Sequence, residues 1–306
     1  MTTRRIVFMG SPDFAVPSLD ILLQHRYHVA GVITAPDKPA GRGMKQQPSA
    51  IKKFSLEQKL NILQPVKLKD ESFLHQLHVL KPDLAIVVAF RMLPQVVWQL
   101  PPLGTVNLHG SLLPQYRGAA PINWAIMNGE RETGVTTFFL RHEIDTGKII
   151  FQERMSIGEN ETAGELHDRM KLVGAALVLK TVQAIEQRNY PQTDQPNFPE
   201  LKIAPKIFPH DCRINWQRDV TTIYNQIRGL SPVPAAFTLL NEKVLKIFSA
   251  KPVYEMAQLE PGVVDSDGAN YLRFAAADGF LEVLELQMEG KKRMNVGEFL
   301  RGYRLH

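Results

Sequence analysis

Short apolar runs alternate with helical patterns along the first half of the chain. Strands are expected at four places, residues 5–9, 28–34, 83–89 and 105–109. Helical spacing lies between them, at residues 14–25, 49–59 and 70–80. The run 83–89 is apolar almost throughout, which is typical of a strand covered on both faces. This alternation predicts an α/β domain, in which helices cover both sides of a parallel sheet.

A long helical pattern follows, and the composition then changes. Thr162 and Glu165 have the spacing of a capping box, so a helix is expected from there to about Gln187. Residues 189–200 hold three prolines among polar residues. Such a composition predicts an extended linker.

Beyond the linker, the pattern is one of short strands separated by turns. The expected strands are residues 235–240, 244–250, 271–275 and 281–287, with helices near 220–228 and 296–301. A small β-barrel or sandwich fits this pattern. We therefore expect a first domain at 1–188, a linker at 189–206 and a C-terminal domain at 207–306.

The length and composition are those of a globular protein with about two domains. The chain has 306 residues, of which 44% are hydrophobic and 22% charged. No apolar run approaches the roughly 20 residues that cross a bilayer, so no membrane span is expected. The single cysteine, Cys212, excludes an intrachain disulfide and fits a cytoplasmic location.

The positive charge is concentrated in one segment. Residues 35–53 carry a net charge of +4 of the chain's +5, because only Asp37 opposes five basic residues, Lys38, Arg42, Lys45, Lys52 and Lys53. This placement favours a specific anionic partner, although most charge runs are only solvated surface. Residues 35–48 lack helix or strand periodicity, and a loop of this length is usually functional or disordered.

An amide and an imidazole stand two residues apart at the end of the strand 105–109. Asn107 and His109 should face the same side of it, about 7 Å apart. An amide donor beside a histidine suits a reaction that forms an oxyanion while a proton moves. Asp145 would complete the set by fixing the tautomer of the imidazole. The alternative is that Asn107 caps a turn and His109 is an ordinary half-buried histidine.

Several motifs taken together resemble the folate-dependent formyltransferase family. In the first part of the chain they are residues 10–15, 107–121, 133–137 and 145–147. In the second part they are residues 203–207, 228–234 and 298–305. The resemblance therefore covers essentially the whole chain.

The resemblance implies a fold, a reaction and a set of site residues. The fold would be a Rossmann-like parallel-sheet domain followed by a C-terminal OB-like β-barrel domain. 10-Formyltetrahydrofolate would donate a formyl group to the methionine amino group of initiator methionyl-tRNA, with Asn107, His109 and Asp145 as catalytic residues. The implied folate-binding residues are Ser111, Leu112, Leu113 and Pro114, with a pterin pocket at Phe90, Met92 and Leu93.

Basic residues in both domains are the expected tRNA contacts. In the first domain they are Lys38, Arg42 and Lys45, with Arg42 near the terminal base pair of the acceptor stem. In the second they are Lys206, Lys291, Lys292 and Arg293. No metal site is expected, and a monomer is the default.

The chain departs from the family pattern before Asp145, where residues 140–144 are Leu-Arg-His-Glu-Ile, and we assign His142 there to the surface.

Three other functions are alternatives to this interpretation. A formyltransferase acting on a small amine would share the catalytic residues without needing the basic loop. A tRNA-binding protein without turnover would not need the three catalytic side chains. An NAD-dependent oxidoreductase is disfavoured, because residues 10–15 lack the spaced glycines of a dinucleotide site.

Overall fold

The structure is a computed structural model that describes residues 4–40, 45–256 and 258–303. The chain divides into two compact units, and each draws on separate stretches of sequence. The first unit comprises Met1–Arg117, Gly134–Met155 and His167–Lys202, and the second comprises Gly118–Thr133, Ser156–Leu166 and Ile203–His306. Most of the segment that we predicted as a linker therefore belongs to the first unit.

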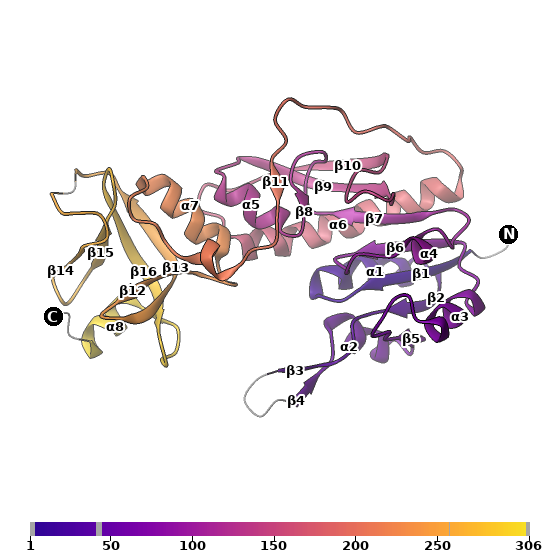
Figure 1. Cartoon of the computed structure of the whole chain (residues 1–306), viewed down its shortest axis with the longest axis horizontal. Coiled ribbons are helices and arrows are strands. Elements are labelled where there is room, and N and C mark those ends of the chain that lie inside the picture. The colour runs from indigo at the N-terminus through magenta and orange to yellow at the C-terminus, as the bar shows by residue number, and fades with distance from the viewer. Residues whose placement is uncertain (1–3, 41–44, 257, 304–306) are drawn as a thin grey trace. The chain divides into compact units, whose positions relative to one another are not determined.

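A seven-stranded sheet, drawn in Figure 1, forms the centre of the first unit. Its order is β10-β9-β7-β6-β1-β2-β5. The strands are β1 (Arg5–Gly10), β2 (His28–Ile33), β5 (Ile62–Leu63), β6 (Leu84–Val88), β7 (Thr105–His109), β9 (Glu132–Phe139) and β10 (Ile149–Ser156). Five adjacent strands, β5, β2, β1, β6 and β7, run parallel to one another. The next strand, β9, is antiparallel to β7. The predicted Rossmann-like sheet is confirmed, and it has an antiparallel edge that the sequence did not suggest.

Helices cover this sheet. They are a short 3-10 turn (Asp13–Ala15), α1 (Val16–Gln24), α2 (Ala50–Glu57), α3 (Glu71–Val79), α4 (Gln95–Trp98) and α6 (Ala163–Glu186). The predicted capping box starts α6, because Thr162 N donates to Glu165 Oε2 at 2.8 Å and Glu165 N donates to Thr162 Oγ1 at 3.3 Å. None of the helices in the described part of the chain is long and apolar enough to cross a membrane.

The basic segment 35–48 is not the irregular loop that we expected. It forms a hairpin of β3 (Lys38–Ala40) and β4 (Lys45–Gln47), in which Lys38 pairs with Gln47. Residues 41–44, between the two strands in the sequence, lie outside the described residues. No strand periodicity is visible in the sequence because each strand has only three residues and the side chains described in them, Lys38, Pro39, Gln46 and Gln47, are all exposed.

An antiparallel sheet forms the second unit. Its order is β12-β13-β16-β15-β14, with β17 paired to β16, which makes an open half-barrel. The strands are β12 (Ala236–Leu240), β13 (Lys243–Val253), β14 (Val264–Ser266), β15 (Leu272–Ala275), β16 (Phe280–Met288) and β17 (Met294–Asn295). The helices are α5 (Pro121–Met127), α7 (Val220–Leu230), α8 (Val296–Gly302) and a 3-10 turn (Pro209–Cys212), and β8 (Arg117–Gly118) pairs with β11 (Ile203–Ala204).

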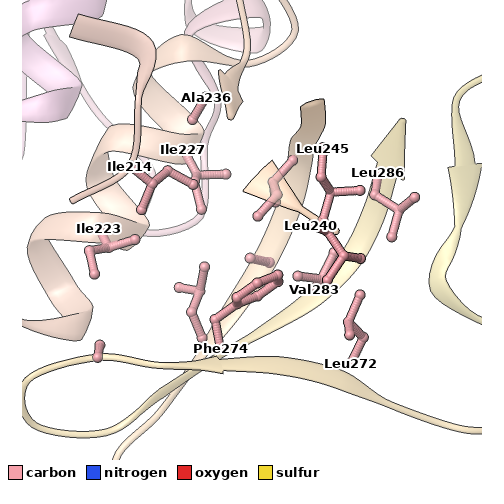
Figure 2. Packing of buried hydrophobic residues seen from close by; sticks show 14 of the residues in the cluster. Ile214, Ile223, Ile227, Ala236, Leu240, Leu245, Leu272, Phe274, Val283 and Leu286 are labelled. Carbon is pink, nitrogen blue, oxygen red and sulfur yellow. The ribbon is translucent and has the colours of Figure 1, made fainter. Parts of the chain in front are cut away.

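One apolar core holds the second unit together. Ile223 and Ile227 of α7 point toward Phe274 and the strand side chains around it, as Figure 2 shows. The ring of Trp216 stacks on Phe274 with 4.6 Å between the ring centres. Cys212 is buried in the same core. Because α7 brings apolar residues at helical spacing against an alternating sheet, both patterns could be recognised in the sequence.

Candidate active site

Asn107 and His109 lie on one face of β7, at its carboxyl end. Asn107 pairs with Val87 of β6 on one side and with Phe138 of β9 on the other, so the backbone is fixed from both edges. The opposite face of β7 packs on α6, where a side chain at Gly174 would lie 2.7 Å from Leu108. Among the described residues the half-buried Asn107 amide makes no hydrogen bond. Its N–H groups are therefore available to an oxygen.

The imidazole of His109 is only 6% exposed and has two distinct neighbours. Its Nε2 lies 2.8 Å from the carbonyl oxygen of Tyr116, and its Nδ1 lies 3.8 Å from Oδ2 of Asp145. A carbonyl oxygen only accepts, so Nε2 must carry the hydrogen. In a neutral ring, Nδ1 is then the nitrogen that accepts a proton. We had expected Asp145 to fix the tautomer, and the structure gives that role to the backbone at Tyr116.

Both residues that face His109 have unusual backbones. Tyr116 has φ +59° and Asp145 has φ +54°, in the left-handed region that glycine prefers. Such a conformation costs a side-chain-bearing residue about 1 kcal/mol or more, and it persists only where the surroundings impose it. Strain therefore occurs at the two positions that set the geometry around the imidazole.

The loop that carries Asp145 is held by Gln195. The Gln195 amide donates to the carbonyl oxygens of Asp145 at 2.7 Å and Gly147 at 2.9 Å, and its Oε1 accepts from Nε of Arg117 at 3.0 Å. Neither Gln195 nor Arg117 is predicted as a site residue from the sequence. Arg117 lies inside the motif 107–121, whereas Gln195 lies in a proline-rich stretch with the composition of a linker.

A second group of contacts fixes the backbone at Tyr116. Tyr116 N donates to the carbonyl oxygen of Lys202 at 2.6 Å. The side chain of Gln115 accepts from Lys202 N at 2.8 Å and donates to the carbonyl oxygen of Glu200 at 3.2 Å. The backbone that carries the carbonyl bound to His109 is thus held by residues 200–202 through one backbone hydrogen bond and two hydrogen bonds of the Gln115 side chain.

The expected folate-binding residues 111–114 form a tightly bonded segment. Ser111 is fully buried and its hydroxyl donates to the carbonyl oxygen of Gln115 at 2.6 Å. Thr136 donates to Ser111 O at 2.6 Å and accepts from Leu113 N at 3.2 Å, and Gln152 donates to Leu113 O at 3.0 Å. Pro114 is also buried and Leu112 is half-buried. These hydrogen bonds fix the 111–114 segment directly after β7.

The three apolar residues expected in the pterin pocket differ in environment. Phe90 and Leu93 are half-buried and pack on the core cluster that also contacts Leu140, whereas Met92 is 73% exposed. Arg91 anchors their loop by donating to the carbonyl oxygens of Pro65 and Val66. Partial burial lowers the pKa of the Arg91 guanidinium.

A cavity of about 660 Å³ adjoins the Asp145 loop. Its lining includes Trp98, Arg117, Leu140, Thr146 and Gln195. Apolar and polar side chains together in a hollow of this size are typical of a small-molecule site. His142 also belongs to this lining, and it is exposed, as the sequence predicts.

The basic hairpin is fixed to the first unit at its base. Asp37 contacts Lys52 Nζ at 2.7 Å and accepts from the Gln64 amide at 2.9 Å. These two hydrogen bonds hold the pKa of Asp37 below its ordinary value. Lys52 is therefore neutralised locally, and Lys38 and Lys45 lie on the hairpin strands. The expected contact residue Arg42 lies outside the described residues.

The basic residues expected to contact tRNA in the second unit are not equivalent. Lys291 and Lys292 are exposed on the turn after β16. Nζ of Lys206 lies 5.5 Å from the ring centre of the exposed Phe208. Arg293, in contrast, forms a two-fold hydrogen-bonded ion pair with Glu285 and covers the ring of Phe248 at 4.3 Å. Its charge is thus already compensated.

One cluster of possible metal ligands occurs in the part of the chain that the structure describes. Donor atoms of Asp13, His167 and Asp168 lie within 4.8 Å of one another. Nζ of Lys171 lies 2.6 Å from Asp168 and 3.4 Å from Asp13. An ammonium group therefore already provides the positive charge between these carboxylates.

Comparison with known proteins agrees with this architecture. Residues 4–182 match the model of a family described as formyl transferase, and residues 206–304 match the formyl transferase C-terminal domain. The chain is 54% identical to the methionyl-tRNA formyltransferase of Bacteroides thetaiotaomicron over 98% of this chain and 96% of that protein. It is 50% identical to the methionyl-tRNA formyltransferase of Flavobacterium johnsoniae over 99% of this chain and 97% of that protein.

The fold also resembles solved structures. One is the N-formyltransferase from Helicobacter canadensis in complex with folinic acid and dTDP-3-aminofucose, which matches with a TM-score of 0.70. The match covers 93% of this chain and 99% of that one, at 22% sequence identity. At this identity the likeness supports the fold alone.

Proposed function

Because the chain belongs to the formyl transferase family, we propose that it transfers a formyl group from 10-formyltetrahydrofolate to the α-amino group of initiator methionyl-tRNA. Identity of 54% over nearly the full length of a methionyl-tRNA formyltransferase is the observation that carries this proposal. The arrangement of Asn107, His109 and Asp145 supports it chemically. It brings a hydrogen-bond donor, the Asn107 amide, and a proton acceptor, the His109 imidazole, to the end of one strand, with the Asp145 carboxylate 3.8 Å from the imidazole.

In the proposed reaction, the methionine amine attacks the formyl carbon. A carbon–nitrogen bond forms, and the carbonyl oxygen of the formyl group becomes negative. The amide of Asn107 would donate to this oxygen, and one such preorganised donor lowers the barrier by about 3 to 4 kcal/mol. Asn107 suits the role because β6 and β9 fix its backbone while its amide has no other partner among the described residues.

His109 would then move the proton. Its Nε2 hydrogen is committed to Tyr116, so Nδ1 is the site that takes a proton from the attacking amine. The positive ring would be stabilised by the carboxylate of Asp145 at 3.8 Å. The same proton passes to the folate nitrogen as the old carbon–nitrogen bond breaks, so no net proton remains on the enzyme. An α-amino group has a pKa of about 8, so much of the methionine amine is near its reactive form at neutral pH. Expulsion of the folate nitrogen is the harder step, because this nitrogen must gain a proton.

The formyl donor would bind beside the Asp145 loop. The pterin would contact Phe90 and Leu93, which are half-buried, and Met92. The adjacent side of the binding site would be formed by the hydrogen-bonded segment of Ser111, Leu112, Leu113 and Pro114. The cavity of about 660 Å³ adjoins this position through Leu140, which packs on the same core cluster as Phe90 and Leu93, but none of the seven residues above lines it.

The tRNA would contact the basic hairpin and the second unit. We assign acceptor-stem contacts to Lys38, Arg42 and Lys45, and phosphate contacts in the second unit to Lys206, Lys291 and Lys292. The phosphate contact expected at Arg293 is not part of this assignment, because Glu285 already compensates its charge. Each neutralised phosphate should contribute about 0.7 to 0.9 to the slope of log affinity against log salt. The exposed Lys291 and Lys292 are the strongest candidates in the second unit, because Arg293 is already paired with Glu285.

One assay tests the proposal. The protein is given 10-formyltetrahydrofolate with initiator methionyl-tRNA, deacylated initiator tRNA, or small amines that include amino sugars, and formylated product is measured. We expect transfer only to the aminoacylated tRNA. Formylation of an amino sugar without formylation of methionyl-tRNA would contradict it and favour the small-amine function.

A further inference from the structure

The stretch from Thr193 to Lys202, here called the 193–202 segment, touches both residues that face His109. At one end, Gln195 donates to the carbonyl oxygen of Asp145 at 2.7 Å. At the other, the carbonyl oxygen of Lys202 accepts from Tyr116 N at 2.6 Å. All of these residues belong to the first unit. A stretch with the composition of a linker thus contacts the site twice.

The two contacts occur at residues with strained backbones. Asp145 and Tyr116 are among the non-glycine residues with left-handed backbones, and each is hydrogen-bonded by the 193–202 segment. Because such a conformation is unfavourable by itself, the bonds that impose it decide where the Asp145 carboxylate and the Tyr116 carbonyl lie. Both nitrogens of His109 depend on these two groups.

We propose that the 193–202 segment is a structural part of the active site and that Gln195 is a positioning residue for the Asp145–His109 pair. The catalytic consequence of this role rests on the proposed formyl transfer, whereas the positioning itself does not. Gln195 acts through Asp145 and need not touch a substrate.

The amide of Gln195 has a defined orientation. Its oxygen faces Arg117, which donates from Nε at 3.0 Å, so its NH₂ group faces the carbonyls of Asp145 and Gly147. Arginine can only donate, and the two carbonyls can only accept. The site therefore needs a group with an acceptor on one side and donors on the other, and a glutamine amide provides both.

Gln195→Glu separates these two roles. The carboxylate keeps the acceptor for Arg117, but it offers no donor to Asp145 and Gly147 and places negative charge against their oxygens. The rest of the segment should stay in place, because Thr193 and Ile149 exchange backbone hydrogen bonds at 2.8 and 3.0 Å. Gln192→Glu is the matched control, since Gln192 is exposed three positions earlier and receives the same change.

The test combines hydrogen–deuterium exchange of residues 140–148 with steady-state formyl transfer. For Gln195→Glu we expect faster exchange in 140–148, a fall in kcat of about ten- to a hundredfold, and KM for methionyl-tRNA within about twofold of the unchanged protein. Gln192→Glu should match the unchanged protein in all three.

The outcomes separate this proposal from the proposed function. Unchanged exchange in residues 140–148 of Gln195→Glu would overturn the positioning role, whatever the activity. Faster exchange with kcat unchanged would overturn its catalytic importance. If the unchanged protein transfers no formyl group at all, the proposed function fails, and the exchange measurement alone still decides whether Gln195 positions Asp145.

Discussion

Nδ1 of His109 faces Oδ2 of Asp145 across 3.8 Å, longer than a hydrogen bond, and both side chains are largely buried. With Nε2 committed to the Tyr116 carbonyl, a proton on Nδ1 gives a positive ring whose nearest carboxylate in the described structure is Asp145. The pair is therefore arranged to stabilise the protonated ring.

Asp145→Asn should lower the transfer step strongly. The amide keeps the size of the side chain and removes the charge that stabilises the imidazolium, so we expect single-turnover formyl transfer to fall by about a hundredfold or more. Asp20→Asn is the control, because among the described residues the Asp20 side chain of α1 is hydrogen-bonded only by Gln24 of the same helix. Equal rates in Asp145→Asn and the unchanged protein would exclude a catalytic role for this carboxylate.

Asn107→Ala should affect the reaction and spare the binding of the donor. Loss of one oxyanion donor costs about 3 to 4 kcal/mol, which is a fall of roughly a hundred- to a thousandfold in the rate of transfer. The folate affinity, measured by ligand fluorescence at equilibrium, should stay within about twofold. A variant that binds folate poorly and transfers normally once saturated would place Asn107 in binding instead.

Local patterns in the sequence were sufficient for most of the fold. The strands β1, β6 and β7 and the helix α6 were predicted because burial of one face leaves a period in the sequence. The hairpin of β3 and β4 is not predicted from the sequence, since its strands have three residues each and their described side chains are exposed, which leaves no period.

The site was only partly visible in the sequence, for a different reason. Asn107 and His109 share a strand, and so their proximity followed from strand geometry. Gln195 lies 50 residues from Asp145 along the chain, and the contact between them is made through backbone oxygens that carry no side-chain signature. The Tyr116 carbonyl escaped notice in the same way.

The basic hairpin should determine how strongly tRNA binding depends on salt. Replacing Lys38 and Arg42 together by alanine should reduce the slope of log affinity against log salt by about 0.7 to 0.9 per lost phosphate contact. Folate affinity should not change. Lys67→Ala, at an exposed lysine outside the hairpin, is the control. If the double variant and the control show the same slope, the hairpin is only solvated surface.

Asp37 should attach the hairpin over the whole neutral range of pH. Hydrogen bonds from Lys52 and Gln64 lower the pKa of its carboxyl group from 3.8. A lowered pKa in the folded protein means that the stabilisation is present above the unfolded value and is lost as the pH falls through the folded one. Asp37→Asn should therefore speed hydrogen exchange in residues 45–47 equally at pH 6 and pH 8, after correction for intrinsic rates. A difference between variant and unchanged protein that grows steadily from pH 6 to pH 8 would contradict this assignment.

Arg293 and Lys292 should respond differently to alanine, although both are basic and exposed. Arg293 pairs with Glu285 and covers Phe248, so its removal should lower the free energy of unfolding by about 1 kcal/mol, from a partly exposed ion pair and a cation–π contact. Lys292 has no such partner among the described residues, and its removal should instead reduce the salt slope of tRNA binding. Chemical denaturation and tRNA titrations at several salt concentrations distinguish the two effects. If Arg293→Ala reduces the salt slope as much as Lys292→Ala does, the Glu285 pair opens on tRNA binding and both residues contact phosphate.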